Sequence, residues 1–110
     1  MAAAMVDHEL NELRKEFLDE ALDKVEEMQT TFDAQHDRDA LERLAYLAHQ
    51  LKGSGGSYGY QRISDDAAEL EKAVELLAEL GGDGISLDDK IREHVRNLRS
   101  EIESATKELE

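Results

Sequence analysis

Apolar residues recur every three or four positions in four separate segments of the 110-residue chain, and polar residues fill the positions between them. That spacing places the apolar residues on one face of an α-helix. No stretch long enough to form a strand alternates apolar and polar residues, as a half-buried strand would. We therefore predict helices over roughly residues 7–32, 39–58, 61–80 and 87–108, and no sheet. The predicted core stripes are Leu10, Leu13, Phe17, Ala21, Val25, Met28 and Phe32; Leu41, Leu44, Ala48 and Leu51; Ile63, Ala67, Leu70, Val74 and Leu77; and Leu87, Ile91, Val95, Leu98, Ile102, Ala105 and Leu109.

The first break between stripes carries residues that commonly start a helix. Asp37 and Asp39 are both candidate N-caps for the second helix, because an aspartate side chain accepts a hydrogen bond from the free backbone N–H groups of the first turn. Asp39 with Glu42 also has the spacing of a capping box.

The other two breaks are marked by glycine. Gly59 separates the second helix from the third, with Ser64 as a candidate cap, and residues 81–84 end the third helix. Ser86 with Asp89 repeats the capping-box spacing before the fourth helix. Such short connections make consecutive helices antiparallel neighbours, so the predicted fold is all-α: an up-down-up-down four-helix bundle that forms a single domain over residues 1–110.

Composition and charge narrow the range of partners. The chain has neither proline nor cysteine, which favours helices and a reducing compartment. Its 27 acidic and 13 basic residues give a net charge of −14, which disfavours nucleic acid as a partner and favours a monomer with a solvated acidic surface. It contains neither a signal-peptide pattern nor the run of about 20 apolar residues that spans a bilayer, so we expect a cytoplasmic protein without a membrane partner.

One segment of the second predicted helix contains several residues that disfavour a helix. The second stripe indicates that the helix is well under way at His49, yet Gly53, Gly55 and Gly56 follow closely. Each interior glycine costs about 1 kcal/mol relative to alanine, so the three together cost on the order of 3 kcal/mol. Local rules broken in one cluster often mark a functional site. The alternative is that the helix ends at Gly53 and a loop follows.

Helical geometry favours the functional interpretation. His49 points away from the stripe through Leu44, Ala48 and Leu51, and therefore towards solvent. Its own face of the helix carries Lys52, Gly53 and Gly56 in one direction and Tyr46, Ala45 and Glu42 in the other. An exposed imidazole with a cation one turn away and bare positions beside it suits a nitrogen that accepts a phosphoryl group, because the lysine offsets the phosphoryl charge and the glycines admit another protein.

These residues resemble a known signature. Ala48-His49-Gln50-Leu51-Lys52-Gly53-Ser54, with Gly59 six residues after Gly53, is similar to the motif of the histidine phosphotransfer (HPt) family. Leu70-Glu71 resembles a further pair common in that family, and Glu16-Phe17-Leu18-Asp19-Glu20-Ala21 resembles its acidic opening helix. The similarity extends over roughly Leu10 to Leu80, and the block from His49 to Gly59 is its specific part.

The resemblance implies a function and a division of roles. Such domains accept phosphate from the receiver domain of a hybrid histidine kinase, or from a kinase directly, and pass it to a response regulator. They have no kinase activity and need no cofactor, because the magnesium ion is bound by the receiver. His49 would then be the phosphoacceptor, Lys52 would support the phosphoryl charge, Gln50 would donate a hydrogen bond, and Gly53 would keep the approach open. A docking rim is implied beside the histidine, formed by Tyr46, Tyr58 and Tyr60. The predicted partner-binding residues are Gly53, Gly56, Tyr46, Ala45, Glu42 and Tyr58.

Three other functions match parts of the sequence. A di-metal bundle needs a Glu-x-x-His pair on each of two helices, and no glutamate stands three residues before any of the four histidines, so we predict no metal site. The glycine run resembles a phosphate-binding loop, but it lacks the Lys-Ser/Thr ending and a preceding strand. A helical module that docks a receiver or other partner without carrying phosphate stays the main alternative, and the exposure of His49 discriminates between the two.

Overall fold

The computed structural model describes the backbone of residues 2–34, 37–80 and 85–109, and the side chains of residues 8–34, 37–80 and 87–109. The described chain consists of four helices: α1 (Ala2–Ala34), α2 (Arg38–Ser57), α3 (Gln61–Leu80) and α4 (Ile85–Leu109). The predicted all-α class is confirmed. α1 and α4 begin earlier than the sequence pattern indicates, because the stripe of apolar residues starts later than the helical backbone itself.

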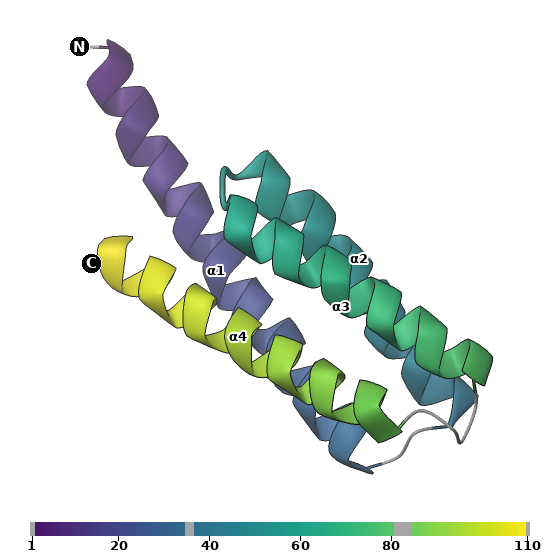
Figure 1. The fold of residues 1–110 in the computed structure, drawn as a ribbon. Helices are drawn as coiled ribbons and strands as arrows, with labels where there is room; N and C mark the ends of the chain where they lie inside the picture. Colours follow the sequence, from purple (N-terminus) through teal and green to yellow (C-terminus); the bar gives the residue numbers. More distant parts are fainter. Residues whose placement is uncertain (1, 35–36, 81–84, 110) are drawn as a thin grey trace.

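The helices run alternately up and down, and the predicted bundle is confirmed (Figure 1). Each helix packs against two others, in the order α1, α2, α3, α4 and back to α1, so α2 and α4 lie diagonally across the bundle. The Cα atoms extend over 57 × 20 × 19 Å. Much of the long dimension comes from α1, whose first turns project past the end of α4 (Figure 1).

The core lies along the bundle axis and follows the predicted stripes closely. Leu18 and Leu47 belong to the core as well, although the stripes omit them. Leu13 is the clear exception in the other direction, because its side chain is 47% exposed. Leu10, which is nearer the end of α1, and Arg14 are both less exposed, so Leu13 lies beside the covered face of the helix rather than on it. The fully buried large side chains are Phe32, Leu18, Met28, Leu44, Leu47, Leu51, Ile63, Leu70, Ile91, Leu98, Ile102 and Val25.

The start of α2 distinguishes the two candidate caps. Asp37 is the N-cap, and its carboxylate accepts a hydrogen bond from the backbone N–H of Ala40 at 2.9 Å. Asp39 lies within the first turn, so the predicted capping box of Asp39 with Glu42 is wrong. The Glu42 carboxylate instead accepts a hydrogen bond from Arg38 Nε at 3.2 Å on the helix surface.

The turn between α2 and α3 depends on one glycine. Gly59 has a φ of +86°, a left-handed conformation that non-glycine residues rarely adopt. The backbone N–H of Tyr60 then donates to the carbonyl of Gly55 at 2.8 Å, which closes the turn. Gly59 therefore separates the two helices as predicted.

Neither serine proposed as a helix cap is an N-cap. α3 begins at Gln61, so Ser64 lies inside its first turn, and its hydroxyl donates to the Lys52 carbonyl on α2 at 2.8 Å. α4 begins at Ile85, so Ser86 also lies inside a helix. The predicted stop at residues 81–84 falls outside the described residues.

One carboxyl group between α3 and α4 has an unusual environment. Burial and a hydrogen bond with the Asp66 carboxyl raise the pKa of Glu101 to about 7, and the charge of Asp65 adds to this while Arg62 opposes it. The Oε2 atom of Glu101 is buried, without a conventional hydrogen-bond donor. A pair of carboxyl groups in contact is stable only while they share a proton.

We expect this pair to make folding sensitive to pH. Because the pKa of Glu101 is higher in the folded chain than its ordinary value of 4.5, the stabilisation is complete below about pH 4.5 and is lost as the pH rises through about 7. In urea titrations the free energy of unfolding should fall by about 1–2 kcal/mol between about pH 5.5 and 8, allowing for solvent screening. Glu101→Gln should lose this decline and be the more stable protein at pH 8.

Glu79→Gln is the matched control, because Glu79 is exposed on α3. It should keep the pH dependence of the parent. Identical pH profiles for Glu101→Gln and the parent would show that the contact with Asp66 holds no proton.

Candidate functional site

His49 lies on the outer face of α2, whereas its neighbours Ala48 and Leu51 on the same helix are buried. Its side chain is 68% exposed. The imidazole Nδ1 lies 3.0 Å from Oε2 of Glu71 on α3. Because a carboxylate can only accept, this hydrogen bond requires the hydrogen on Nδ1, which leaves the lone pair of Nε2 directed away from Glu71.

Glu71 connects His49 to Lys52. Its side chain is only 16% exposed, and its second oxygen, Oε1, lies 3.8 Å from Lys52 Nζ. One carboxylate therefore orients the imidazole and attracts the cation that stands one turn further along α2. Glu71 was not predicted as a site residue. Its only signal in the sequence was the Leu70-Glu71 pair in the family resemblance.

The glycines lie inside α2, which continues to Ser57, so the alternative that the helix ends at Gly53 is excluded. They serve different purposes. A Cβ on Gly53 would meet no other atom within 4 Å, and one on Gly56 would meet only the Ser64 hydroxyl at 3.6 Å. Gly55 is buried, and a Cβ there would come within 3.1 Å of the Ser64 backbone nitrogen. Gly55 therefore allows α2 and α3 to pack closely, whereas Gly53 leaves open space beside His49.

Gln50 has a partner within α2. Its Nε2 donates to the Tyr46 hydroxyl at 2.8 Å, so the amide predicted to serve a phosphoryl group is engaged one turn away. Tyr46 is 52% exposed. Two further positions were predicted on this face. Ala45 packs against the core, and the Glu42 side chain is 66% exposed beside Arg38.

The two other tyrosines of the expected rim contribute to packing. Tyr58 stacks on Phe17 of α1 with ring centres 5.0 Å apart, and Tyr60 stacks on the same ring at 5.9 Å. Arg14 Nε donates to the Tyr58 carbonyl at 3.4 Å. These contacts attach the α2–α3 turn to α1, and both tyrosines are partly buried against the core.

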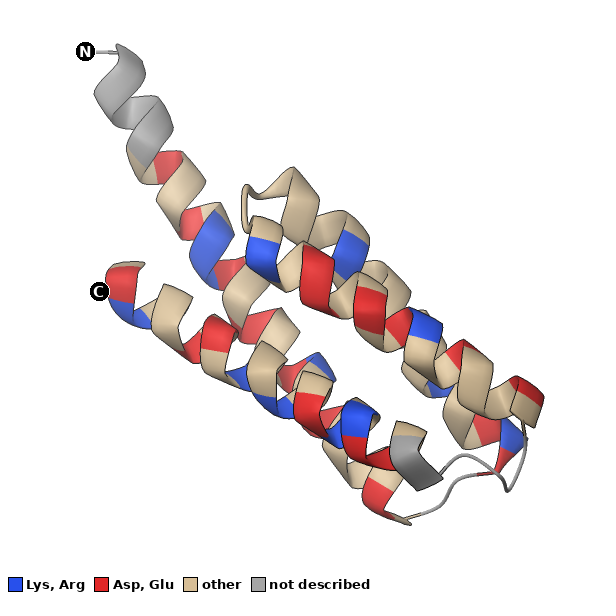
Figure 2. Ribbon diagram, in the orientation of Figure 1, with Lys and Arg blue, Asp and Glu red and all other residues tan. Residues whose placement is uncertain are grey.

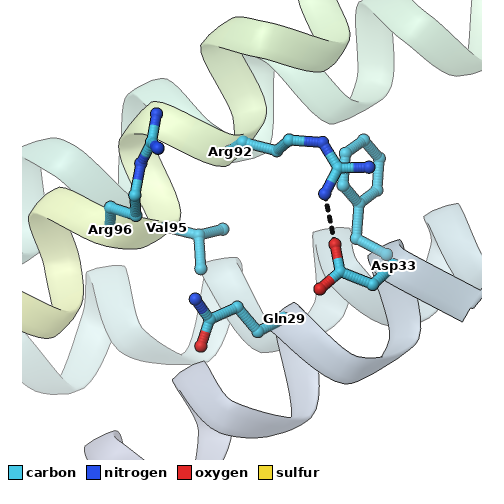
Figure 3. Close-up of a pocket in the computed structure, with 6 residues that line it drawn as sticks. Gln29, Asp33, Arg92, Val95 and Arg96 are labelled. Atoms are coloured by element: carbon cyan, nitrogen blue, oxygen red, sulfur yellow. Dashed lines mark hydrogen bonds and ion pairs between the residues drawn. The ribbon is translucent and has the colours of Figure 1, made fainter.

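A polar depression, separate from the His49 site, lies between α1 and α4, on the side of the bundle away from α2 (Figure 3). It has a volume of about 140 Å³. Arg92 pairs with Asp33 and lies over the Phe32 ring at 4.9 Å from its centre. Gln29 points into the same space, but its Oε1 already accepts a hydrogen bond from Arg99. The arginine–carboxylate pair that dominates this depression is satisfied and contains no nucleophile.

Charged residues occur along all four helices, and acidic ones outnumber basic ones (Figure 2). Among the residues that the structure describes, no group of three or more His, Cys, Asp or Glu side chains could hold a metal ion. None of the described helices is both long and apolar enough to cross a membrane.

Comparison with family models matches residues 12–107 to the Hpt domain. The chain belongs to the Hpt domain family. Hpt domains are helical phosphocarrier modules of two-component phosphorelays, have no kinase activity of their own and interact with receiver domains. Separate searches of curated proteins and of solved structures found no match to the chain.

Proposed function

We propose that this Hpt domain carries a phosphoryl group on Nε2 of His49, accepting it from the receiver domain of a hybrid histidine kinase or from a kinase, and passing it to the receiver aspartate of a response regulator. The observation that carries the proposal is the hydrogen bond from Nδ1 of an otherwise exposed imidazole to Glu71. It leaves Nε2 as the nucleophile and directs it towards an incoming protein.

The transfer balances without any other reactant. The Nε2 lone pair attacks the phosphorus of an aspartyl phosphate, the bond between phosphorus and the aspartate oxygen breaks, and the carboxylate leaves with the electron pair. No proton has to leave Nε2, because the ring hydrogen is on Nδ1. The positive charge that develops on the ring is stabilised by the Glu71 carboxylate. Onward transfer to the next aspartate is the reverse of these steps, and the magnesium ion is bound by the receiver.

Lys52 is the residue best suited to support the phosphoryl group. Its side chain is about half exposed, and its Nζ lies 3.8 Å from Glu71, farther than His49 Nδ1 does. A phosphoryl dianion on Nε2 would compete strongly for this cation, because its oxygens carry more charge than one carboxylate does. The lysine would then shift from Glu71 towards the phosphoryl oxygens, while Glu71 keeps its hydrogen bond with Nδ1.

The alternative is a module that docks a receiver without carrying phosphate. A histidine that served only as part of a docking surface would not need its nucleophilic nitrogen left accessible. The 68% exposure of the His49 side chain favours the phosphocarrier. The acidic surface and the absence of cysteine are consistent with a monomer that works in the cytoplasm.

The test is phosphoryl transfer from a panel of purified receiver domains. Each receiver is phosphorylated on its aspartate in the presence of magnesium, mixed with the Hpt domain, and followed by the appearance of label on the Hpt chain. We expect rapid, stoichiometric transfer from at least one receiver. A domain that binds receivers but gains no label would support the docking alternative.

Lys52→Ala should slow transfer by roughly tenfold or more, which corresponds to about 1.4 kcal/mol of lost electrostatic support. The variant removes a surface side chain, so its free energy of unfolding should change by no more than about 0.5 kcal/mol. Rapid-quench kinetics with the fastest receiver measure the first quantity, and urea denaturation measures the second.

Lys72→Ala is the matched control. Lys72 follows Glu71 on α3, but its side chain is 75% exposed and its ammonium group pairs with Glu69 at 3.7 Å. It should transfer at the parental rate. Equal rates for Lys52→Ala and the parent would mean that Lys52 is only a solvated side chain.

A further inference from the structure

Tyr46 is exposed, yet its ring is held by its neighbours. Half of the side chain, 52%, is open to solvent. Its hydroxyl accepts a hydrogen bond from Gln50 at 2.8 Å, and the guanidinium carbon of Arg43 lies 5.5 Å from the ring centre. An aromatic ring fixed from two directions loses little conformational freedom when a partner covers it, which is the property of a strong interface residue.

Arg43 is itself fixed from the neighbouring helix. Its Nε and NH2 groups donate to the two oxygens of Glu27 on α1, at 2.5 Å and 3.0 Å. This bidentate pair lowers the pKa of Glu27 and raises the pKa of Arg43. Glu27, Arg43, Tyr46 and Gln50 thus form one connected set, which we term the Tyr46 anchor, and it ends beside His49.

An open groove of about 380 Å³ adjoins the Tyr46 anchor between α1 and α2. The Tyr46 ring is its exposed apolar surface, because Leu47 beneath it is buried, and Glu20, Asp23 and Lys24 line the α1 side. Glu27 and Arg43 neutralise each other, which leaves two carboxylates and one ammonium group. Neither Glu20 nor Asp23 forms an ion pair with any residue that the structure describes. The groove therefore combines one exposed aromatic ring with an excess of negative charge.

We propose that the Tyr46 anchor and this groove select the receiver, and that the matching receiver inserts a lysine or arginine side chain, with its aliphatic part on the Tyr46 ring and its cation between Glu20 and Asp23. The inference rests on the proposed function, because a receiver that brings its aspartate to His49 must cover the adjacent turn of α2. On its other flank α2 packs closely against α3, where a Cβ on Gly55 would lie only 3.1 Å from the Ser64 backbone nitrogen.

Three variants test the surface with the fastest receiver from the transfer panel. Tyr46→Ala removes the ring. Arg43→Gln breaks the ion pair with Glu27 that holds the guanidinium group beside the ring. Glu20→Lys reverses one charge of the groove on the exposed face of α1. Each should raise the KM for the phosphorylated receiver, by about tenfold for Tyr46→Ala, with a much smaller effect on kcat. In Glu20→Lys the loss should be partly recovered at high salt, where charge repulsion is screened.

Leu80→Ala is the matched control, because Leu80 is a similarly exposed apolar side chain, 49%, at the far end of α3. It should keep the parental KM. Labelling by phosphoramidate, a small phosphodonor that needs no docking surface, reports separately on His49.

The two hypotheses fail in different ways. Parental KM values in both Tyr46→Ala and Glu20→Lys, with transfer intact, would overturn the docking surface and leave the phosphocarrier function in place. A fall in kcat at constant KM would also overturn it, because the residues would then act on the chemical step. Failure of His49 to gain label from every receiver and from phosphoramidate would refute the proposed function, and the docking inference with it.

Discussion

His49→Gln should remain folded and gain no phosphoryl group from any receiver. Glutamine has no nucleophilic nitrogen, so we expect the loss of labelling to be complete, the largest effect of any single substitution. Its amide can still donate a hydrogen bond to the Glu71 carboxylate. Without a donor at position 49 this carboxylate, which is only 16% exposed, would lose that hydrogen bond. The free energy of unfolding should therefore stay within about 0.5 kcal/mol of the parent. In the parent, the label should survive alkali and be lost in acid, as a phosphorus–nitrogen bond does.

His8→Gln is a demanding control, because His8 resembles His49 in two respects. Its side chain is 77% exposed, and its Nε2 lies 3.2 Å from a carboxylate oxygen of Glu12. It has neither a lysine one turn away nor an open glycine stripe, so we expect His8→Gln to label at the parental rate. Acid-stable label on a serine, or undiminished label in His49→Gln, would contradict the assignment of His49.

Helical periodicity was sufficient to predict the bundle and the outward direction of His49. Each core stripe repeats every three or four residues, so the position of Leu44, Ala48 and Leu51 on the inner face determines that His49 lies on the outer one. Periodicity worked less well for Leu13. Leu13 follows Leu10 by three residues, but its side chain lies beside the buried face of α1 that runs through Phe17 and Leu18, and spacing alone does not distinguish the two positions.

The Glu71 contacts could not be predicted from spacing. Glu71 is 22 residues from His49 in the sequence and reaches it only because α2 and α3 adopt one particular register. That register depends on the close approach of Gly55 to Ser64 and on the hydrogen bond from Ser64 to the Lys52 carbonyl. These are properties of two packed helices rather than of either stripe. The Gln50–Tyr46 hydrogen bond, in contrast, has the local i, i+4 spacing that sequence inspection could have identified.

Gly53→Leu should block phosphoryl transfer without unfolding the protein. A side chain at Gly53 meets nothing within 4 Å, so the bundle has room for leucine, and replacing a helical glycine stabilises the helix by up to about 1 kcal/mol. The new side chain stands one turn from His49 and would occupy the space that a receiver aspartate must enter. We expect the transfer rate to fall by about a hundredfold or more, equivalent to about 2.7 kcal/mol. Gly53→Ala, which adds one methyl group, should stabilise by about 0.4–1 kcal/mol.

Gly55→Leu provides the opposite result from a position only two residues away. A Cβ at Gly55 would already lie 3.1 Å from the Ser64 backbone nitrogen and 3.3 Å from Ile63 Cγ2, so leucine there should destabilise the bundle by several kcal/mol through overpacking. Thermal melts and transfer rates on both variants separate the two roles of glycine in this helix. A stable Gly53→Leu protein with normal transfer would show that the open space is not the approach to His49. An unfolded one would mean that Gly53, like Gly55, is needed for helix packing, and the bare stripe beside the histidine would then have a structural explanation alone.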